Sequence, residues 1–192
     1  LHNLKGNREN QAFVDLNDEI LKENSGAWDL PPESVSWSGS HKQRARDLLN
    51  NNTSPGVFGF KDPRTLLVLD GWKEVSPELE FVGIFRHPDE VARSLAKRGS
   101  MEREKALKLW YAYNLILYRQ YQDNPFPLLC FDVDEDVLQE KIHRVAIRLG
   151  LNSGSEQEGF YSSELRTERS GDVKPLPWKV RLLYYKLKMK CI

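Results

Sequence analysis

The amino-acid sequence predicts an α/β protein, and three observations support that prediction. Short apolar segments at 56–60, 81–85 and 126–131 have the length and the β-prone composition of buried strands. Segments with helical apolar spacing lie between these runs and after the last one. This alternation of strands and helices indicates a parallel sheet, because parallel strands need crossover connections, which are usually helices. We therefore expect a three-layer fold, in which helices flank a parallel sheet.

The first part of the chain is predicted to be helical. An amphipathic helix is expected over 7–24, because apolar residues recur there at helical spacing and Asn-Ser-Gly at 24–26 provides an end signal. The segment 27–40 reads as a loop, since it contains two prolines, two tryptophans and several serines. A short helix is predicted at 41–50, before the first apolar run.

The helices of the second part follow its strands. A weak helical pattern covers 64–72, and clearer patterns cover 88–98 and 102–122. A helix at 135–149 is well signalled, because acidic residues stand near its start and Gly150 lies just past its end.

The end of the chain has two predicted parts. Residues 151–177 are polar and are expected to form a long surface segment. A closing helix is expected at 178–190, with its apolar face docked on the domain and its lysines facing water.

Composition limits the classes of protein that this chain resembles. The chain has 192 residues, which is enough for one sizeable core, so 1–192 is predicted to be a single domain. Lys plus Arg and Asp plus Glu both total 28, so the net charge is zero and no overall positive charge favours binding to nucleic acid. No apolar run approaches the roughly 20 residues of a membrane span. Neither Cys130 nor Cys191 has metal-site spacing, and we expect a cytoplasmic protein.

Arg86 stands where the second predicted strand ends and a helix begins. Pro88 fits the first turn of that helix, where its missing N–H costs nothing. Free backbone N–H groups, the helix dipole and a guanidinium would together form an anion site, and Ser94 could add a hydroxyl. The alternative is that Arg86 pairs with Asp89 or Glu90 and that Ser94 is a surface residue.

Lys61 repeats this arrangement one predicted strand earlier. It follows the apolar run at 56–60 and precedes an Asp-Pro step. A cation at the end of each of two adjacent strands favours an anionic ligand more than one alone. The alternative is an ion pair of Lys61 with Asp62 or Glu9.

These motifs together resemble the bacterial branch of the sulfotransferase family, over nearly the whole chain. "FRHPDEVARSL" at 85–95 is similar to that family's 3′-phosphate-binding element, and "KDPR" at 61–64 to the element on the preceding strand. "NLKGNRENQAFVDLND" at 3–18 resembles the segment after the family's first helix, and "LRTERSGDVKPLPWKVRLLYYKL" at 165–187 its closing part.

The resemblance implies a fold, a co-substrate and roles for four residues. The fold would be the one shared with P-loop nucleotide hydrolases, and the co-substrate would be 3′-phosphoadenosine 5′-phosphosulfate. Arg86 and Ser94 would bind the 3′-phosphate, Lys61 would neutralise charge on the leaving oxygens, and Glu9 would be the general base. No metal is implied, and the acceptor would be a small molecule, carbohydrate or lipid. Without the resemblance, Glu9 reads as a residue of the first helix that is stabilised by the helix dipole.

The chain also departs from the family pattern. The family's first strand and the phosphate-binding loop after it have no counterpart here, so we expect this polypeptide to be inactive or nearly so. A missing strand would leave a sheet edge open for self-association. The third strand ends in Phe131 and Asp132, where many relatives have a tyrosine and an acid.

Two other functions remain as alternatives. A non-catalytic relative could retain the fold as a nucleotide-binding or interaction module. A P-loop kinase is disfavoured, because the glycine-rich lysine motif of such enzymes does not occur.

Overall fold

The computed structural model describes residues 9–52, 57–151 and 175–192, which group into two compact units. One unit spans Lys5–Leu79 and the other includes Glu80–Ile192. Each unit has its own buried residues. Most of the predicted surface segment at 151–177 lies outside the described residues.

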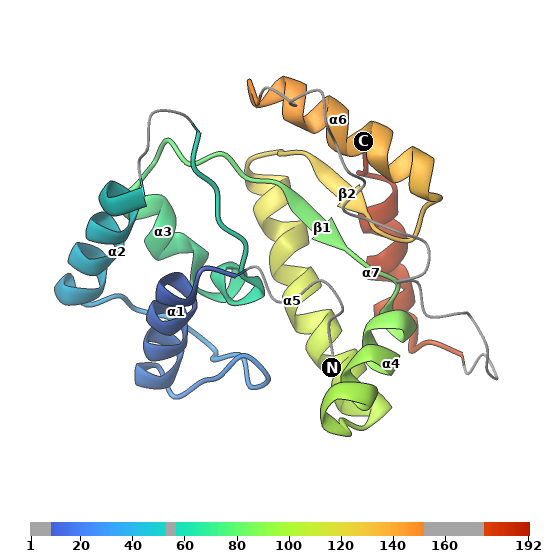
Figure 1. Cartoon of the computed structure of the whole chain (residues 1–192). Coiled ribbons are helices and arrows are strands. Elements are labelled where there is room, and N and C mark those ends of the chain that lie inside the picture. Colours follow the sequence, from blue (N-terminus) through green and yellow to red (C-terminus); the bar gives the residue numbers. More distant parts are fainter. Residues whose placement is uncertain (1–8, 53–56, 152–174) are drawn as a thin grey trace. The chain divides into compact units, whose positions relative to one another are not determined.

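The unit Lys5–Leu79 is helical. Its elements are α1 (Gln11–Glu23), α2 (Gly39–Asn52), the 3₁₀-helix η1 (Pro63–Val68) and α3 (Leu69–Val75), shown in Figure 1. α1 begins at an Asn10 cap, whose side chain accepts a hydrogen bond from the Ala12 N–H. One face of α1 is buried against α2 and η1. The buried residues of that face are Phe13, Val14, Leu16, Asn17, Ile20 and Leu21.

The first predicted strand is not found: described residues 57–60 form no strand. Phe58 and Phe60 instead pack against Phe13, and the Phe13 and Phe60 ring centroids are 4.1 Å apart. The Trp72 ring completes this cluster, 5.1 Å from Phe60. A strand requires a neighbour for its backbone hydrogen bonds, and none of the described residues pairs with this segment. Its two phenylalanine rings therefore pack in an aromatic cluster, while Val57 is exposed.

Within the predicted loop at 27–40, the side chain of Trp37 packs against Trp72 of α3. The ring of Trp37 lies edge-on to Trp72, with centroids 5.4 Å apart. It covers Gly71, where an added Cβ would lie 2.1 Å from the indole. Any side chain at position 71 would therefore displace Trp37. Glycine is needed here because the Trp37 indole lies directly against its Cα, and not because of its backbone angles.

The unit Glu80–Ile192 combines helices with a small parallel sheet. Its elements are β1 (Gly83–Phe85), α4 (Pro88–Gly99), α5 (Arg103–Asp123), β2 (Leu128–Cys130), α6 (Glu135–Arg148) and α7 (Trp178–Lys188) (Figure 1). β1 and β2 pair in parallel, with Ile84 opposite Leu129. The described part of the chain is thus mostly helical with one small parallel sheet, a composition that agrees with the α/β class but does not include the three-layer sheet that was expected. The sheet has two strands in the described part of the chain.

The helices of this unit pack as amphipathic helices do. α5 packs against α4 and α7, and α6 packs against β2. Gly150, just beyond α6, has a φ of +66°, which confirms the glycine end signal. α7 docks as predicted, by four buried side chains: Val180, Leu183, Tyr184 and Leu187. None of the described helices has the length and apolarity needed to cross a membrane.

Candidate functional site

Arg86 lies at the carboxyl edge of the parallel sheet. It directly follows β1, while Phe131 and Asp132 directly follow β2. The Phe131 N–H donates to the Phe85 carbonyl at 2.9 Å, which holds these two strand ends together. The indole N–H of buried Trp110 on α5 donates to the Arg86 carbonyl at 2.9 Å. The backbone of Arg86 is therefore fixed from two directions at the edge where α/β proteins bind ligands.

The Arg86 guanidinium is half-buried beside one ring and two carboxylates. Its central carbon lies 4.8 Å from the centre of the Phe131 ring, a cation–π distance. Glu90 and Asp132 each place a carboxylate oxygen 3.9 Å from an Arg86 nitrogen. That distance allows Coulombic attraction but is too long for a hydrogen bond. The Arg86 Nε is buried and has no hydrogen-bond partner among the described residues.

Both carboxylates already have closer partners. Glu90 accepts a hydrogen bond from Arg93, three residues further along α4, and Asp132 accepts one from the His87 backbone N–H. Asp89 binds Arg103 at 2.8 Å and so is not the ion-pair partner of Arg86. The pairing with Glu90 that the sequence offered as an alternative is present only at the longer distance. Neither carboxylate therefore forms a hydrogen bond with Arg86, whose side chain is 33% exposed although its Nε is buried.

The backbone at the start of α4 differs from the expectation of free N–H groups. The His87 N–H is bound to Asp132, Pro88 has no N–H, and the Asp89 N–H donates to Nδ1 of the His87 side chain at 3.3 Å. These three positions are therefore satisfied within the chain. Any anion at this edge must be bound chiefly by side chains.

Ser94 lies on α4, one helical turn after Glu90. Residues four apart share a helix face, so Ser94 is on the same side of α4 as the carboxylate that faces Arg86. The side chain is half-buried, and its hydroxyl makes no hydrogen bond with the described residues. Arg86 and Ser94 thus both present unused donors in the unit Glu80–Ile192.

Glu9 and Lys61 form a pair in the unit Lys5–Leu79. The Lys61 ammonium donates to Glu9 Oε1 at 2.6 Å, which is one of the two ion pairs considered for Lys61. The Glu9 side chain is 20% exposed and that of Lys61 is 68% exposed. The hydrogen bond from Lys61 lowers the pKa of Glu9 below its ordinary value, and partial burial opposes this only in part.

The Glu9–Lys61 pair predicts a weak pH dependence of stability. Because the folded pKa of Glu9 is lowered, its contribution is present above the unfolded value of 4.5 and is lost as the pH falls through the folded pKa. For a solvent-accessible pair we expect less than about 1 kcal/mol. Urea unfolding of wild type and Glu9→Gln should differ at pH 7 and converge at acid pH. A difference that grows as the pH falls would contradict the assignment.

A buried polar network holds the segment that follows Lys61. The Asn17 amide donates to Asp62 Oδ2 at 2.9 Å and to Thr65 Oγ1 at 3.0 Å, and its oxygen accepts from the Trp72 indole at 2.9 Å. Asp62 also accepts from Arg64, both from the backbone N–H and from the guanidinium at 2.9 Å. The sequence contained one signal of this network: Asn17 is a polar residue on the apolar face of α1.

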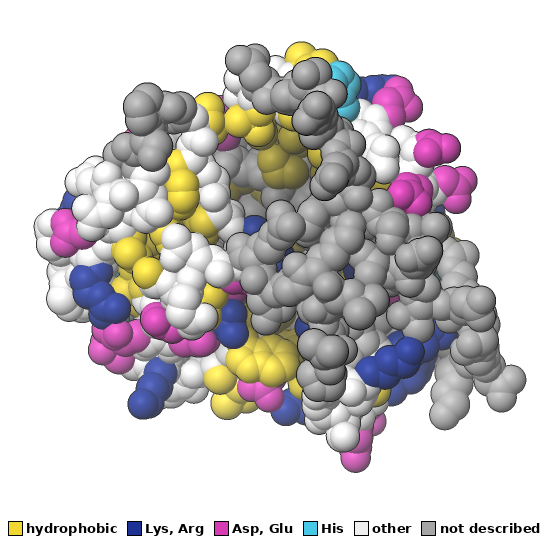
Figure 2. Space-filling view, viewed as in Figure 1, with side chains coloured by type: hydrophobic (Ala, Val, Ile, Leu, Met, Phe, Trp, Pro, Cys, Tyr) yellow, Lys and Arg dark blue, Asp and Glu magenta, His cyan; other side chains and the backbone are white. Residues whose placement is uncertain are grey.

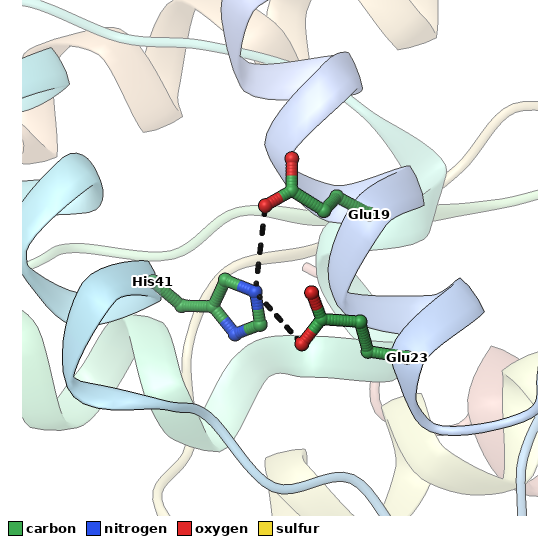
Figure 3. A group of neighbouring side chains, drawn as sticks. All are labelled: Glu19, Glu23 and His41. Atoms are coloured by element: carbon green, nitrogen blue, oxygen red, sulfur yellow. Dashed lines mark ion pairs between the residues drawn. The ribbon is translucent and has the colours of Figure 1, made fainter.

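A second group missed by sequence reasoning joins α1 to α2. Figure 3 shows Glu19 and Glu23 of α1 facing His41 of α2, with His41 Nε2 at 3.6 Å and 3.4 Å from the two carboxylates. These are candidate metal ligands. However, His41 Nδ1 accepts the Ser38 N–H at 3.3 Å, so the neutral ring carries its proton on Nε2. The Nε2–H side of the ring therefore faces both carboxylates, and the arrangement favours a polar contact between α1 and α2 over a metal centre.

The four residues predicted from the sequence thus fall into two pairs. Arg86 and Ser94 belong to the unit Glu80–Ile192, and Glu9 and Lys61 to the unit Lys5–Leu79. Both signs of charge are present on the described part of the face drawn in Figure 2, as the zero net charge suggests. Comparisons of the chain with protein-family models, curated proteins and solved structures found no match.

Proposed function

We propose that this chain is a sulfotransferase-like domain that binds an adenosine nucleotide through its 3′-phosphate. The finer fold that this proposal implies is a three-layer sheet of the kind found in P-loop nucleotide hydrolases. The activity would be transfer of a sulfuryl group from 3′-phosphoadenosine 5′-phosphosulfate to a hydroxyl or amine acceptor. The proposal is based on the motifs at 61–64 and 85–95 and on the surroundings of Arg86.

One observation is the main support: Arg86 has an unused donor at the carboxyl edge of a parallel sheet. Its Nε is buried without a hydrogen-bond partner among the described residues, which is costly unless a ligand supplies one. A phosphate oxygen is a suitable acceptor, because the guanidinium fork matches phosphate geometry. The Ser94 hydroxyl is a second donor of the kind that the 3′-phosphate needs. The residues present therefore fit the phosphate group.

Glu9 and Lys61 would serve the transfer step. In sulfuryl transfer, as in phosphoryl transfer, charge develops on the leaving oxygen, and positioned cations stabilise it. Lys61 would supply that positive charge, and the Glu9 carboxylate would accept the proton of the acceptor group. In the structure the two side chains bind each other, so a substrate would need to replace their hydrogen bond.

The proposal is tested by calorimetric titration of the full chain with adenosine 3′,5′-bisphosphate and, as a matched control, adenosine 5′-monophosphate. We expect the bisphosphate to bind more tightly by about one to two orders of magnitude, because only it reaches Arg86 and Ser94. Equal affinity for the two nucleotides, or no binding of either, would contradict the proposal.

A non-catalytic binding module is the second candidate, and one observation favours it. The lowered pKa of Glu9 makes its carboxylate a weaker base. General-base catalysis instead favours a carboxylate whose pKa is raised toward the operating pH. A module that binds nucleotide without turnover would give the same titration result. It would differ from an enzyme in transferring no sulfuryl group to any acceptor.

A further inference from the structure

α7 carries a second apolar face in addition to the one that docks it. Its exposed apolar side chains are large, and we call them the outer stripe: Trp178 (65% exposed), Leu182 (46%), Tyr185 (58%) and Met189 (82%). The spacing of four, three and four residues places them in one line along a helix. The buried residues of α7 lie between these positions in the sequence and on the opposite side of the helix. The outer stripe is therefore largely exposed, and only Trp178 and Leu182 also line a groove with α5.

Cations flank the outer stripe on both sides. By helical spacing, Lys179, Lys186 and Lys190 fall along one side of the stripe, and Arg181 and Lys188 along the other. Residues 178–192 contain no Asp or Glu. Their cations make no ion pair with the described residues, although Lys186 lies over the ring of Tyr118, 5.7 Å from its centre. Five cations without an ion-pair partner among the described residues therefore flank an exposed apolar line.

The neighbouring helix extends this surface. A shallow groove of about 330 Å³ lies between α5 and α7, with Trp178, Lys179 and Lys186 on one wall. Tyr118 and Arg119 of α5 lie on the other wall, and none of the described residues that line the groove is a carboxylate. The groove thus adds aromatic rings and a sixth cation to the α7 surface.

We propose that the outer stripe of α7 and the adjoining groove bind the interface of an anionic membrane. Trp and Tyr rings favour the headgroup level of a bilayer, and Leu and Met favour the acyl boundary. Lysines beside the stripe can extend along the apolar layer and reach lipid phosphates and carboxylates. The surface is an elongated stripe on a convex helix, which suits a lipid interface better than a single small ligand. This inference does not depend on nucleotide binding.

Vesicle co-sedimentation of the full chain tests the proposal. We expect it to bind vesicles of equal parts phosphatidylcholine and phosphatidylserine, and to bind phosphatidylcholine vesicles only weakly. The Lys179→Gln/Lys186→Gln variant should lose about fivefold in partitioning for each cation removed. The Leu182→Gln/Met189→Gln variant, which keeps every charge, should also lose most of its binding, since the stripe would no longer enter the interface.

A matched control removes the same charge elsewhere. Lys22→Gln/Lys97→Gln replaces two exposed lysines on α1 and α4 and should leave vesicle binding almost unchanged. Thermal unfolding followed by circular dichroism checks that all variants are folded. Absence of wild-type binding to the anionic vesicles would overturn the proposal, and so would equal losses in the α7 and control variants. Full binding by Leu182→Gln/Met189→Gln would overturn the role of the stripe and leave only a charge effect.

Discussion

We expect Asp62→Ala to lose about 3–5 kcal/mol of folding stability in the unit Lys5–Leu79, because it breaks a buried ion pair and leaves its partners unsatisfied. The Asp62 side chain is 1% exposed and binds the Arg64 guanidinium at 2.9 Å. It also accepts from the Asn17 amide, itself fully buried. Urea unfolding followed by tryptophan fluorescence measures the loss, since Trp72 is bound to the same network.

The chain offers a close control for this prediction in Asp18. That residue also binds Arg64, at 2.6 Å from Nε, but its side chain is 46% exposed. We expect Asp18→Ala to cost less than about 1 kcal/mol, as exposed ion pairs do. Asp62→Asn should lie between the two variants, because it keeps an acceptor and loses the charge. Similar costs for Asp62→Ala and Asp18→Ala would show that burial does not set the strength of this network.

The second large effect is expected at Arg86. Arg86→Ala should weaken binding of adenosine 3′,5′-bisphosphate by about 2–3 kcal/mol, which is roughly 30-fold to 150-fold, and should leave adenosine 5′-monophosphate almost unaffected. The physical reason is loss of a charge-assisted hydrogen bond to the 3′-phosphate. Calorimetric titration with both nucleotides measures the change. Arg86→Lys should recover part of the affinity, because it restores the charge without the guanidinium fork.

A control for Arg86 must remove an arginine without touching the sheet edge. Arg148, exposed in the last turn of α6, meets that requirement. Arg148→Ala should bind both nucleotides like the wild type. If Arg86→Ala lowers the affinity for the two nucleotides equally, Arg86 does not recognise the 3′-phosphate.

Local signals in the sequence were enough to predict the helices. α4, α5, α6 and α7 lie within two residues of their predicted bounds, because each has clear apolar spacing, and Gly150 marks the end of α6. The strand ends at Arg86 and Asp132 were also predictable, since short apolar runs precede both residues.

The remaining features depend on contacts between segments that are distant in the sequence. Residues 57–60 have the composition of a strand, but the rings of Phe58 and Phe60 pack in the cluster around Phe13 instead. Burial of His41 against two glutamates of α1 depends on how α1 and α2 pack, which local patterns do not specify. The capping of α4 by the His87 side chain likewise replaced the free N–H groups that we expected there.

The most direct test of the nucleotide proposal observes the Nε–H group of Arg86. That group has no hydrogen-bond acceptor among the described residues, so its proton resonance should move downfield when a phosphate oxygen accepts from it. A proton–nitrogen correlation spectrum of the arginine Nε–H groups, assigned with Arg86→Lys, would follow it during titration. We predict a shift with adenosine 3′,5′-bisphosphate and none with adenosine 5′-monophosphate. An unshifted Arg86 resonance at saturating bisphosphate would contradict the assignment of this edge as the 3′-phosphate site.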